Sequence, residues 1–349
     1  MSVSSCKSAR AFNLINGSMT TGPINAITDI AGLAVGHVTL RDGGLRTGVT
    51  AVLPHQGNLF RQKVPAAAHV INGFGKSAGL VQVNELGCLE TPIVLTNTLG
   101  VGTAFNALVR HAVAGNPDIG RETGTVNPLV FECNDGFLND IQAMSVSERD
   151  IDAAIVIANT GAFEQGAVGA GTGMSCFGFK GGIGSASRVI ELDGKNYHLG
   201  TLVLSNFGRA GDLVLPDGRR VIPPKAKPVA EKGSVIIIIA TDIPLDHRQL
   251  DRVAKRGGAG LARMGAYWGN GSGDIALAFS TGWAINHDDN RDVVPVMMLN
   301  ENRIDRLFRA AAETTVEAVL NSMTFAPETT GFRQSWRPSL ADWLADHEG

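Results

Sequence analysis

Short runs of apolar and β-branched residues recur along the chain, and they predict buried strands. The runs fall at residues 33–40, 48–53, 92–96, 129–132, 153–158, 201–205, 235–241 and 275–281. The strongest signal is at 235–239, which read Val-Ile-Ile-Ile-Ile. An uninterrupted run of this kind is typical of a strand buried on both faces.

Two further segments carry apolar residues at the spacing of an amphipathic helix. The first has them at positions 250, 253, 254, 261 and 264, and the second at 304, 307, 308, 311, 315 and 319. Strands and helices do not alternate strictly, which argues against a simple doubly wound sheet. The pattern favours an α+β sandwich in which helices cover the sheets.

Residues 212–233 form the least regular stretch of the chain. They combine Pro223, Pro224 and Pro228 with many charges and few apolar positions, which predicts an exposed linker. Ser234 follows directly, and the strongest strand run begins at the next residue. The chain therefore passes from loop to core within two residues at this junction.

Composition narrows the class of protein. Glycine supplies 43 of the 349 residues, about 12% against a usual share near ~7%, which indicates many tight turns. The formal net charge is −3 and the basic residues are scattered, so nothing predicts a nucleic-acid partner. The short basic stretch at 219–232 is typical of a solvated loop.

The cysteines and the hydropathy indicate the cellular compartment in which we expect the protein. Cys6, Cys88, Cys133 and Cys176 form no CxxC pair, so a disulfide framework and structural zinc are both disfavoured. Residues 1–22 hold no apolar core of signal-peptide length, and no later stretch reaches membrane-spanning length. We therefore expect a cytoplasmic protein without a membrane partner.

Ser234 has the surroundings that a serine needs to act at a new amino terminus. An N-to-O acyl shift requires a hydroxyl beside the preceding carbonyl, a permissive residue before it and a rigid strand after it, and Gly233 and the strand run supply these. The α-amine freed by the cut has a pKa of about 7.7–8.0 in model peptides, so it can act as the base without a histidine. Without further support, Gly-Ser before a strand is ordinary turn chemistry.

A rival nucleophile is Ser77, because GKSAG at residues 75–79 fits the G-x-S-x-G elbow of α/β-hydrolases after an apolar run. Such an esterase needs an acid and a histidine later in the chain, and Asp242 and His287 are available. Matches to five-residue patterns are frequent in a glycine-rich chain, so this interpretation ranks second.

Nothing in the chain predicts a cofactor or a metal. The glycine runs at 166–184 and 269–273 resemble nucleotide loops, but they lack the Lys-Ser/Thr pair of a P-loop and the full G-x-G-x-x-G spacing. His287, Asp288 and Asp289 are adjacent rather than spaced to converge on a metal, and there is no HExxH motif. We read them as a surface loop.

Seven blocks of sequence, in order along nearly the whole chain, resemble the family of L-aminopeptidase/D-amidase-esterases and β-aminopeptidases. They lie at 22–40, 46–55, 131–140 (FECNDGFLND), 168–188, 204–213, 233–244 (GSVIIIIATDIP) and 269–282. The resemblance implies a four-layer αββα sandwich, an α+β fold shared with self-cleaving aminopeptidases and ornithine acetyltransferase. It also implies a single domain of residues 1–349, cut into chains 1–233 and 234–349.

The resemblance assigns roles to residues at the junction. It implies that the chain is cut between Gly233 and Ser234, that Ser234 is the nucleophile, and that Asn206 in LSNFG helps to stabilise the oxyanion. It further implies that Ser272 and Asp274 in NGSGD orient the nucleophile. From the residues alone, Asn206 equally suits the end of a strand, and NGSGD a turn that opens one.

The resemblance also implies a substrate. Glu132 in FECNDG matches the acid that holds the free ammonium of the substrate, although an internal salt bridge explains a buried carboxylate equally well. Lys180 in GFKGG is a weaker candidate for polarising the site, since most lysines are merely solvated. The implied substrates are small peptides, amides or esters with a free amine, and the implied assembly is a homo-oligomer of two-chain heterodimers. An acyltransferase of related fold and a self-cleaved binding protein without turnover are the remaining alternatives.

Overall fold

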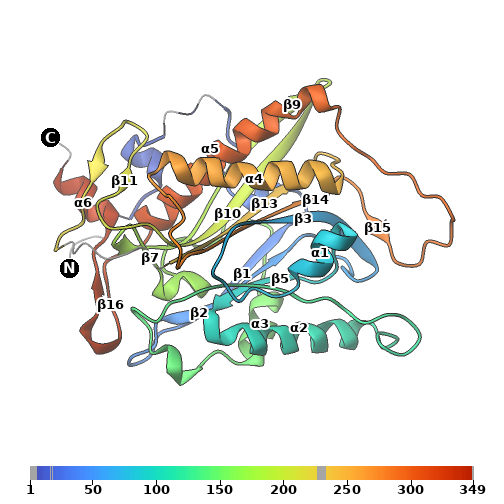
Figure 1. Ribbon diagram of the computed structural model, residues 1–349, viewed down its shortest axis with the longest axis horizontal. Coiled ribbons are helices and arrows are strands. Elements are labelled where there is room, and N and C mark those ends of the chain that lie inside the picture. The colour runs from blue at the N-terminus through green and yellow to red at the C-terminus, as the bar shows by residue number, and fades with distance from the viewer. Residues whose placement is uncertain (1–5, 16, 18, 226–232, 348–349) are drawn as a thin grey trace.

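The computed structural model describes residues 6–15, 17, 19–225 and 233–347. Two β-sheets stack face to face, and helices cover both outer faces, so the chain folds into four layers (Figure 1). Helices α2 (Val101–Gly115) and α3 (Glu148–Val156) cover the smaller sheet. Helices α4 (His247–Arg263) and α5 (Asp305–Thr324) cover the larger one. In the described part of the chain, no helix combines the length and the apolar character that crossing a membrane requires.

The smaller sheet has the strand order β1-β2-β5-β6, and the larger one runs β15-β3-β14-β13-β10-β9, with β4 paired to β3. Two contacts are parallel, β5 with β6 and β13 with β14, and the other pairs in these sheets are antiparallel. The bounds are β1 Ala34–Leu40, β2 Thr47–Leu53, β3 Gln62–Gly73, β4 Cys88–Leu89, β5 Ile93–Asn97, β6 Leu129–Cys133, β9 Gly182–Leu192, β10 Lys195–Asn206, β13 Ser234–Thr241, β14 Gly273–Ser280 and β15 Ile285–Asn286. The remaining α-helices and strands are α1 Leu80–Leu86, α6 Leu340–Asp346, β7 Ser175–Cys176, β8 Phe179–Lys180, β11 Leu213–Val214, β12 Arg220–Val221, β16 Thr329–Thr330 and β17 Trp336–Arg337.

Strand β13 is buried along its whole length because both of its faces are covered. Ile236 and Ile238 pack between the two sheets, together with Phe131 of β6. Ile237 packs on the opposite side, in the core that includes Leu250 of α4. The uninterrupted β-branched run follows from this position, and the predicted αββα sandwich is confirmed.

Seven of the eight predicted strand runs lie in strands, and both predicted helices are present as α4 and α5. The prediction of a strand at 153–158 is wrong, because most of these residues belong to α3. Ser147 and Asp150 form a capping box at the start of the helix, and Ile151 is buried whereas Val156 is 81% exposed. A short apolar run does not distinguish a strand from a helix, and here the Ser-x-x-Asp capping signal decides between them.

The predicted exposed linker is wrong for its first half. Strands β11 and β12 form a hairpin there, and Leu213, Leu215 and Val221 are buried in the core beneath α4 and α5. Three apolar side chains anchor this stretch, although they are too few to produce a periodic signal. Residues 226–232, with Pro228, lie outside the described residues.

Strands β3 and β9 were not predicted, because small residues interrupt their hydrophobic pattern. In β9 the small residues have a packing reason, since α5 lies directly against the strand. A β-carbon on Gly184 would lie 1.9 Å from the carbonyl oxygen of Ala318 and 2.5 Å from the amide nitrogen of Ser322. Because Gly184 has no side chain, the backbone of α5 packs directly against the backbone of β9.

We expect Gly184→Ala to lower the free energy of unfolding by about 3 kcal/mol, because the added methyl must push α5 away from β9. The measurement is denaturant unfolding. Gly102→Ala is the matched control, since a β-carbon on Gly102 of α2 meets no atom within 4 Å. Equal stability of the two variants would contradict the close packing of α5 on β9.

Candidate active site

Three strand ends bring the predicted catalytic residues together at one end of the larger sheet. Ser234 is the first residue of β13, and it lies opposite Asn206, the last residue of β10. On its other side β13 pairs with β14, and Gly273 lies beside Ser234. Ser272 and Asp274 flank Gly273 in the chain. Strand pairing alone thus gathers residues that lie far apart in the sequence.

The peptide carbonyl between Gly233 and Ser234 accepts two hydrogen bonds. Ser234 Oγ donates to it at 2.7 Å, and the backbone N–H of Gly273 donates at 3.0 Å. Only glycine fits at 233, because a β-carbon there would lie 2.3 Å from the carbonyl oxygen of Asn206. Two donors polarise this carbonyl while the neighbouring hydroxyl, in a side chain that is almost fully buried, is held against it.

A buried acid lies beside this pair. Ser272 Oγ donates to Asp274 Oδ1 at 2.7 Å, and both side chains are buried. Asn72 of β3 fixes the turn before β14, since its Nδ2 donates to the carbonyl of Gly269 at 3.1 Å and also to that of Ser272. Sequence reasoning missed Asn72, because its bond to Ser272 spans 200 residues and no local motif marks it.

The side-chain amide of Asn206 is held at both ends. Its Oδ1 accepts the N–H of Ser175 at 2.9 Å, and its Nδ2 donates to the carbonyl of Asn134 at 2.9 Å. The loop that follows β6 therefore sets the orientation of an amide at the end of β10. Asn134 contributes through its backbone, which is why its residue type did not reveal it.

Glu132 of β6 has a buried carboxylate that accepts two hydrogen bonds. Its Oε1 accepts the backbone N–H of Lys76 at 2.8 Å, and its Oε2 accepts the hydroxyl of Thr98. Each carboxylate oxygen keeps one further lone pair for another donor. Thr98 follows β5, which runs parallel to β6, so the two strand ends meet at this carboxylate.

The other buried glutamates in the described part of the chain have basic partners. Glu90 pairs with Lys63 at 2.5 Å, and Glu317 pairs with Arg188 at 2.8 Å. Within the described ranges, no Lys, Arg or His nitrogen lies within 4.0 Å of the Glu132 carboxylate. The described residues therefore form no internal salt bridge with Glu132, which was the other explanation for its burial. A buried carboxylate without a counterion suits a cation that arrives from outside.

Cys133 and Asp135, which follow Glu132 in the chain, are also buried, and burial shifts their pKa values. Burial raises the pKa of Cys133 well above its ordinary value, so the thiol is uncharged at neutral pH. Burial likewise raises the pKa of Asp135 to about 6, although Asn139 donates to its Oδ1 at 3.0 Å.

Lys180 of β8 is fully buried, and backbone oxygens surround its ammonium. Nζ donates to the carbonyls of Gly171 at 2.9 Å, Met174 at 2.9 Å and Gly181 at 2.6 Å. Burial lowers the pKa of Lys180 well below its ordinary value, and the three acceptors oppose that shift because each takes one ammonium proton. With its three N–H groups used, the ammonium has none left for Ser234, and its bonds fix the glycine-rich turns around it.

The residues of the rival serine esterase do not come together. Asp242 accepts the backbone N–H of His198 at 2.7 Å, and the His287 ring lies 2.8 Å from the hydroxyl of Thr123. Ser77 Oγ is buried and has no hydrogen-bond partner among the described residues. The interpretation of GKSAG as a nucleophile elbow is therefore not favoured. In the same described ranges, no three His, Cys, Asp or Glu side chains converge as they would on a metal ion.

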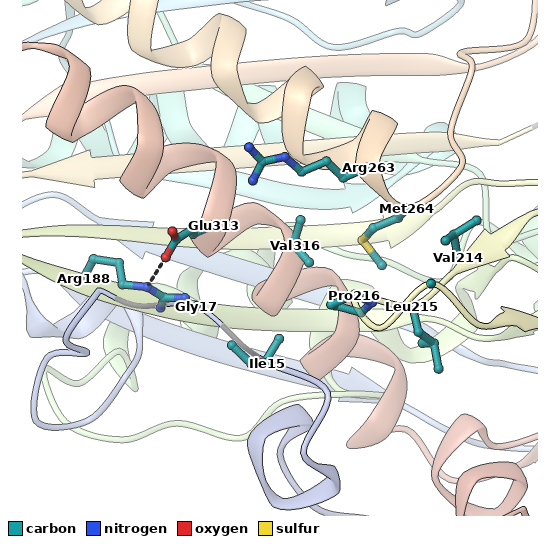
Figure 2. Close-up of a pocket in the computed structure, with 11 residues that line it drawn as sticks. Ile15, Gly17, Arg188, Val214, Leu215, Pro216, Arg263, Met264, Glu313 and Val316 are labelled. Atoms are coloured by element: carbon teal, nitrogen blue, oxygen red, sulfur yellow. Dashed lines mark hydrogen bonds and ion pairs between the residues drawn. The ribbon is translucent and has the colours of Figure 1, made fainter.

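A cavity of about 420 Å³ lies elsewhere in the molecule (Figure 2). Its walls come from the end of α4, from α5 and from the turn between β11 and β12. Arg188 lines it and lies 3.4 Å from Glu313 of α5. None of the predicted catalytic residues lines this cavity.

The four-layer fold, and a buried serine that opens a central strand directly after a polarised carbonyl, define a hydrolase of the N-terminal-nucleophile class. The chain belongs to peptidase family S58, whose family model matches residues 25–337. It is 40% identical over 337 residues to the β-peptidyl aminopeptidase BapA of Sphingosinicella microcystinivorans, covering 89% of this chain and 84% of that one. The predicted family, the predicted fold and the prediction of a peptidase are confirmed.

Two solved structures are similar over almost the whole chain. The PH0078 protein of Pyrococcus horikoshii OT3 has a TM-score of 0.91 and 47% identity, with 97% of this chain and 98% of that one covered. The L-aminopeptidase D-Ala-esterase/amidase of Ochrobactrum anthropi has a TM-score of 0.88 and 34% identity, with 97% and 96% covered. It is described as a variant of the Ntn hydrolase fold and a prototype of the serine aminopeptidases. These matches do not favour the two alternatives, an α/β-hydrolase-type esterase that uses Ser77 and an acyltransferase of related fold.

Proposed function

We propose that this protein is an aminopeptidase or amidase-esterase that cuts itself between Gly233 and Ser234 and then uses Ser234 as its nucleophile. The observation that carries the proposal is the contact of Ser234 Oγ with the Gly233 carbonyl, to which Gly273 also donates. The names of the relatives, a β-peptidyl aminopeptidase and an L-aminopeptidase, support the class of reaction.

Self-cleavage begins when Ser234 Oγ attacks the carbonyl carbon of Gly233. The hydroxyl proton passes to the amide nitrogen of Ser234, the C–N bond breaks, and an ester joins the Gly233 carbonyl carbon to Ser234 Oγ. The N–H of Gly273 stabilises the negative charge on the carbonyl oxygen during the attack. Water then hydrolyses the ester, which leaves a carboxylate on Gly233 and a free α-amine on Ser234.

Turnover repeats this chemistry on a substrate. The new α-amine accepts the proton from Ser234 Oγ, the oxygen attacks the scissile carbonyl, and the leaving amine or alcohol takes the proton as it departs. Asn206 Nδ2 and the N–H of Gly273 donate to the oxyanion, and one such donor contributes about 3–4 kcal/mol. Ser272 and Asp274 orient the nucleophile, and water releases the acyl group from the enzyme.

Glu132 binds the ammonium of the substrate in this proposal. Its carboxylate is buried, carries two hydrogen-bond donors and has no described basic partner, so an ammonium supplies the missing charge. Lys180 supports the site through the turns that its ammonium fixes.

We also propose that the two-chain product assembles into homo-oligomers in the cytoplasm. The segment between β15 and α5 projects from the body of the molecule (Figure 1). It carries a run of exposed apolar side chains, namely Val293, Val294, Val296, Met297 and Met298. Exposed apolar patches of this kind mark surfaces where proteins associate.

The test of the proposed function compares alanine p-nitroanilide with its N-acetylated form, using self-cleaved protein. We expect the free-amine substrate to be hydrolysed at least ~100-fold more efficiently, because acetylation removes the charge that pairs with Glu132. Equal hydrolysis of both compounds would contradict the anchor. Cleaved protein that hydrolyses no peptide, amide or ester with a free amine would contradict the aminopeptidase.

A further inference from the structure

Part of the GKSAG segment, which suggested Ser77 as a rival nucleophile, contacts the candidate active site. We call residues 74–76 the anchor segment, because they connect the carboxylate of Glu132 to the turn before β14. The N–H of Lys76 donates to Glu132 Oε1 at 2.8 Å, and the N–H of Phe74 donates to the carbonyl of Ser272 at 3.2 Å. The anchor segment thus touches both the buried carboxylate and the strand beside Ser234.

Gly75, in the middle of the anchor segment, leaves a gap between these two parts. A β-carbon on Gly75 would lie 3.6 Å from Glu132 Oε1, 3.7 Å from Gly273 Cα and 3.9 Å from Ile275 Cδ1. All three distances are ordinary van der Waals contacts, and Gly75 is not among the residues with positive φ. Neither sterics nor backbone conformation therefore requires glycine at 75.

The two groups beside the gap are the ones that a substrate must reach at the same time. Glu132 has lone pairs left on both carboxylate oxygens, and no described basic group neutralises it. Gly273 supplies the N–H that binds the carbonyl of Gly233, the position that a scissile carbonyl takes in turnover. A substrate that reaches both Glu132 and the N–H of Gly273 must therefore carry an ammonium and a carbonyl.

We propose that the missing side chain of Gly75 sets the room for the first residue of the substrate, which places its primary ammonium on Glu132 and its scissile carbonyl at the Gly273 N–H. The inference rests on the proposed function and deepens it. Glu132 Oε1 and Gly273 Cα both lie within 3.7 Å of a β-carbon placed at 75, so the two groups are close together and the ammonium must be carried on a carbon close to the scissile carbonyl. Substrates whose only amine sits at the end of a long side chain do not fit.

Lys76 and Thr98 are positioning residues in this arrangement. Each of their donors holds one oxygen of the Glu132 carboxylate, so the remaining lone pairs keep a fixed direction. The Lys76 bond comes from the backbone and is therefore insensitive to the side chain at 76. The arrangement makes Gly75 a position where one added carbon atom affects substrate binding.

The test is Gly75→Ala, measured with alanine p-nitroanilide and with free alanine as a competing product. We expect the variant to cut itself normally, because its new methyl does not lie at Gly233. The KM should rise about tenfold or more, the typical effect of one carbon atom in a binding pocket. The inhibition constant of alanine should rise by the same factor, while kcat changes much less.

Gly73→Ala is the matched control, because its β-carbon meets only Val70 Cγ1, at 3.5 Å. We expect wild-type KM from this control. If Gly75→Ala lowers stability, the same comparison is made in an Ile275→Val background, which removes the Cδ1 atom that lies 3.9 Å from the new methyl. Unchanged KM and inhibition constant in a self-cleaved Gly75→Ala protein would overturn the inference. A wild-type protein that is cleaved but inactive on free amines would instead overturn the proposed function.

Discussion

Ser234→Ala should yield a protein that stays in one piece and hydrolyses nothing. Removing the hydroxyl removes the attacking group for the cut and for turnover, and without the cut no α-amine forms to act as the base. We expect kcat/KM to fall by at least ~10⁴-fold, because the nucleophile and its base act as a unit. Among the residues that the structure describes, the lost hydroxyl bonds only to the preceding carbonyl, so thermal unfolding should change little.

Ser77→Ala is the matched control for that experiment. Ser77 is the rival nucleophile, and its Oγ has no hydrogen-bond partner among the described residues. We expect this variant to cut itself as the wild type does. Loss of both cutting and turnover in Ser77→Ala, with both retained in Ser234→Ala, would return the assignment to the serine esterase.

Glu132→Gln should weaken the hydrolysis of free-amine substrates without affecting self-cleavage. The glutamine keeps an oxygen for one of its two donors, Lys76 or Thr98, but it loses the charge that the buried ammonium requires. Removing one partner of a buried, hydrogen-bonded charge pair costs about 3–4 kcal/mol, so kcat/KM should fall by ~10²–10³-fold. The N-acetylated substrate should not respond, because it carries no ammonium.

Glu90→Gln separates the loss of binding from a general loss of stability. Glu90 is as buried as Glu132, but its charge is already paired with Lys63 at 2.5 Å. We expect this variant to be less stable than wild type and to keep its kcat/KM. An unchanged kcat/KM in Glu132→Gln, or equal losses in both variants, would contradict the ammonium site.

The strands of the fold were predictable where burial on both faces left a simple pattern. Strand β13 is the clearest case, because its isoleucines fill two cores at once. Strand β9 was missed because α5 lies so close that Gly184 replaces the expected large residue. Helix α3 was mistaken for a strand because a run of six apolar residues is too short to show its period, and only Ser147 and Asp150 indicate the cap.

The site was predictable only in part. The junction of loop and buried strand drew attention to Ser234, but its role as the nucleophile, like the roles of Asn206 and Glu132, came from the resemblance of whole blocks. Contacts such as that of Thr98 with Glu132, 34 residues apart, arise from strand pairing and leave no local trace in the sequence. The buried lysine at 180 looked like an electrostatic element, and the carbonyls around it became visible only in the fold.

The central claim is that one serine becomes both the amino terminus and the nucleophile of the active protein. Its most direct test is the intact mass of the purified, active protein, together with amino-terminal sequencing of the smaller fragment. The account predicts two chains, residues 1–233 and 234–349, with Ser234 as the first residue of the second. A fully active protein that consists of a single uncut chain would contradict it.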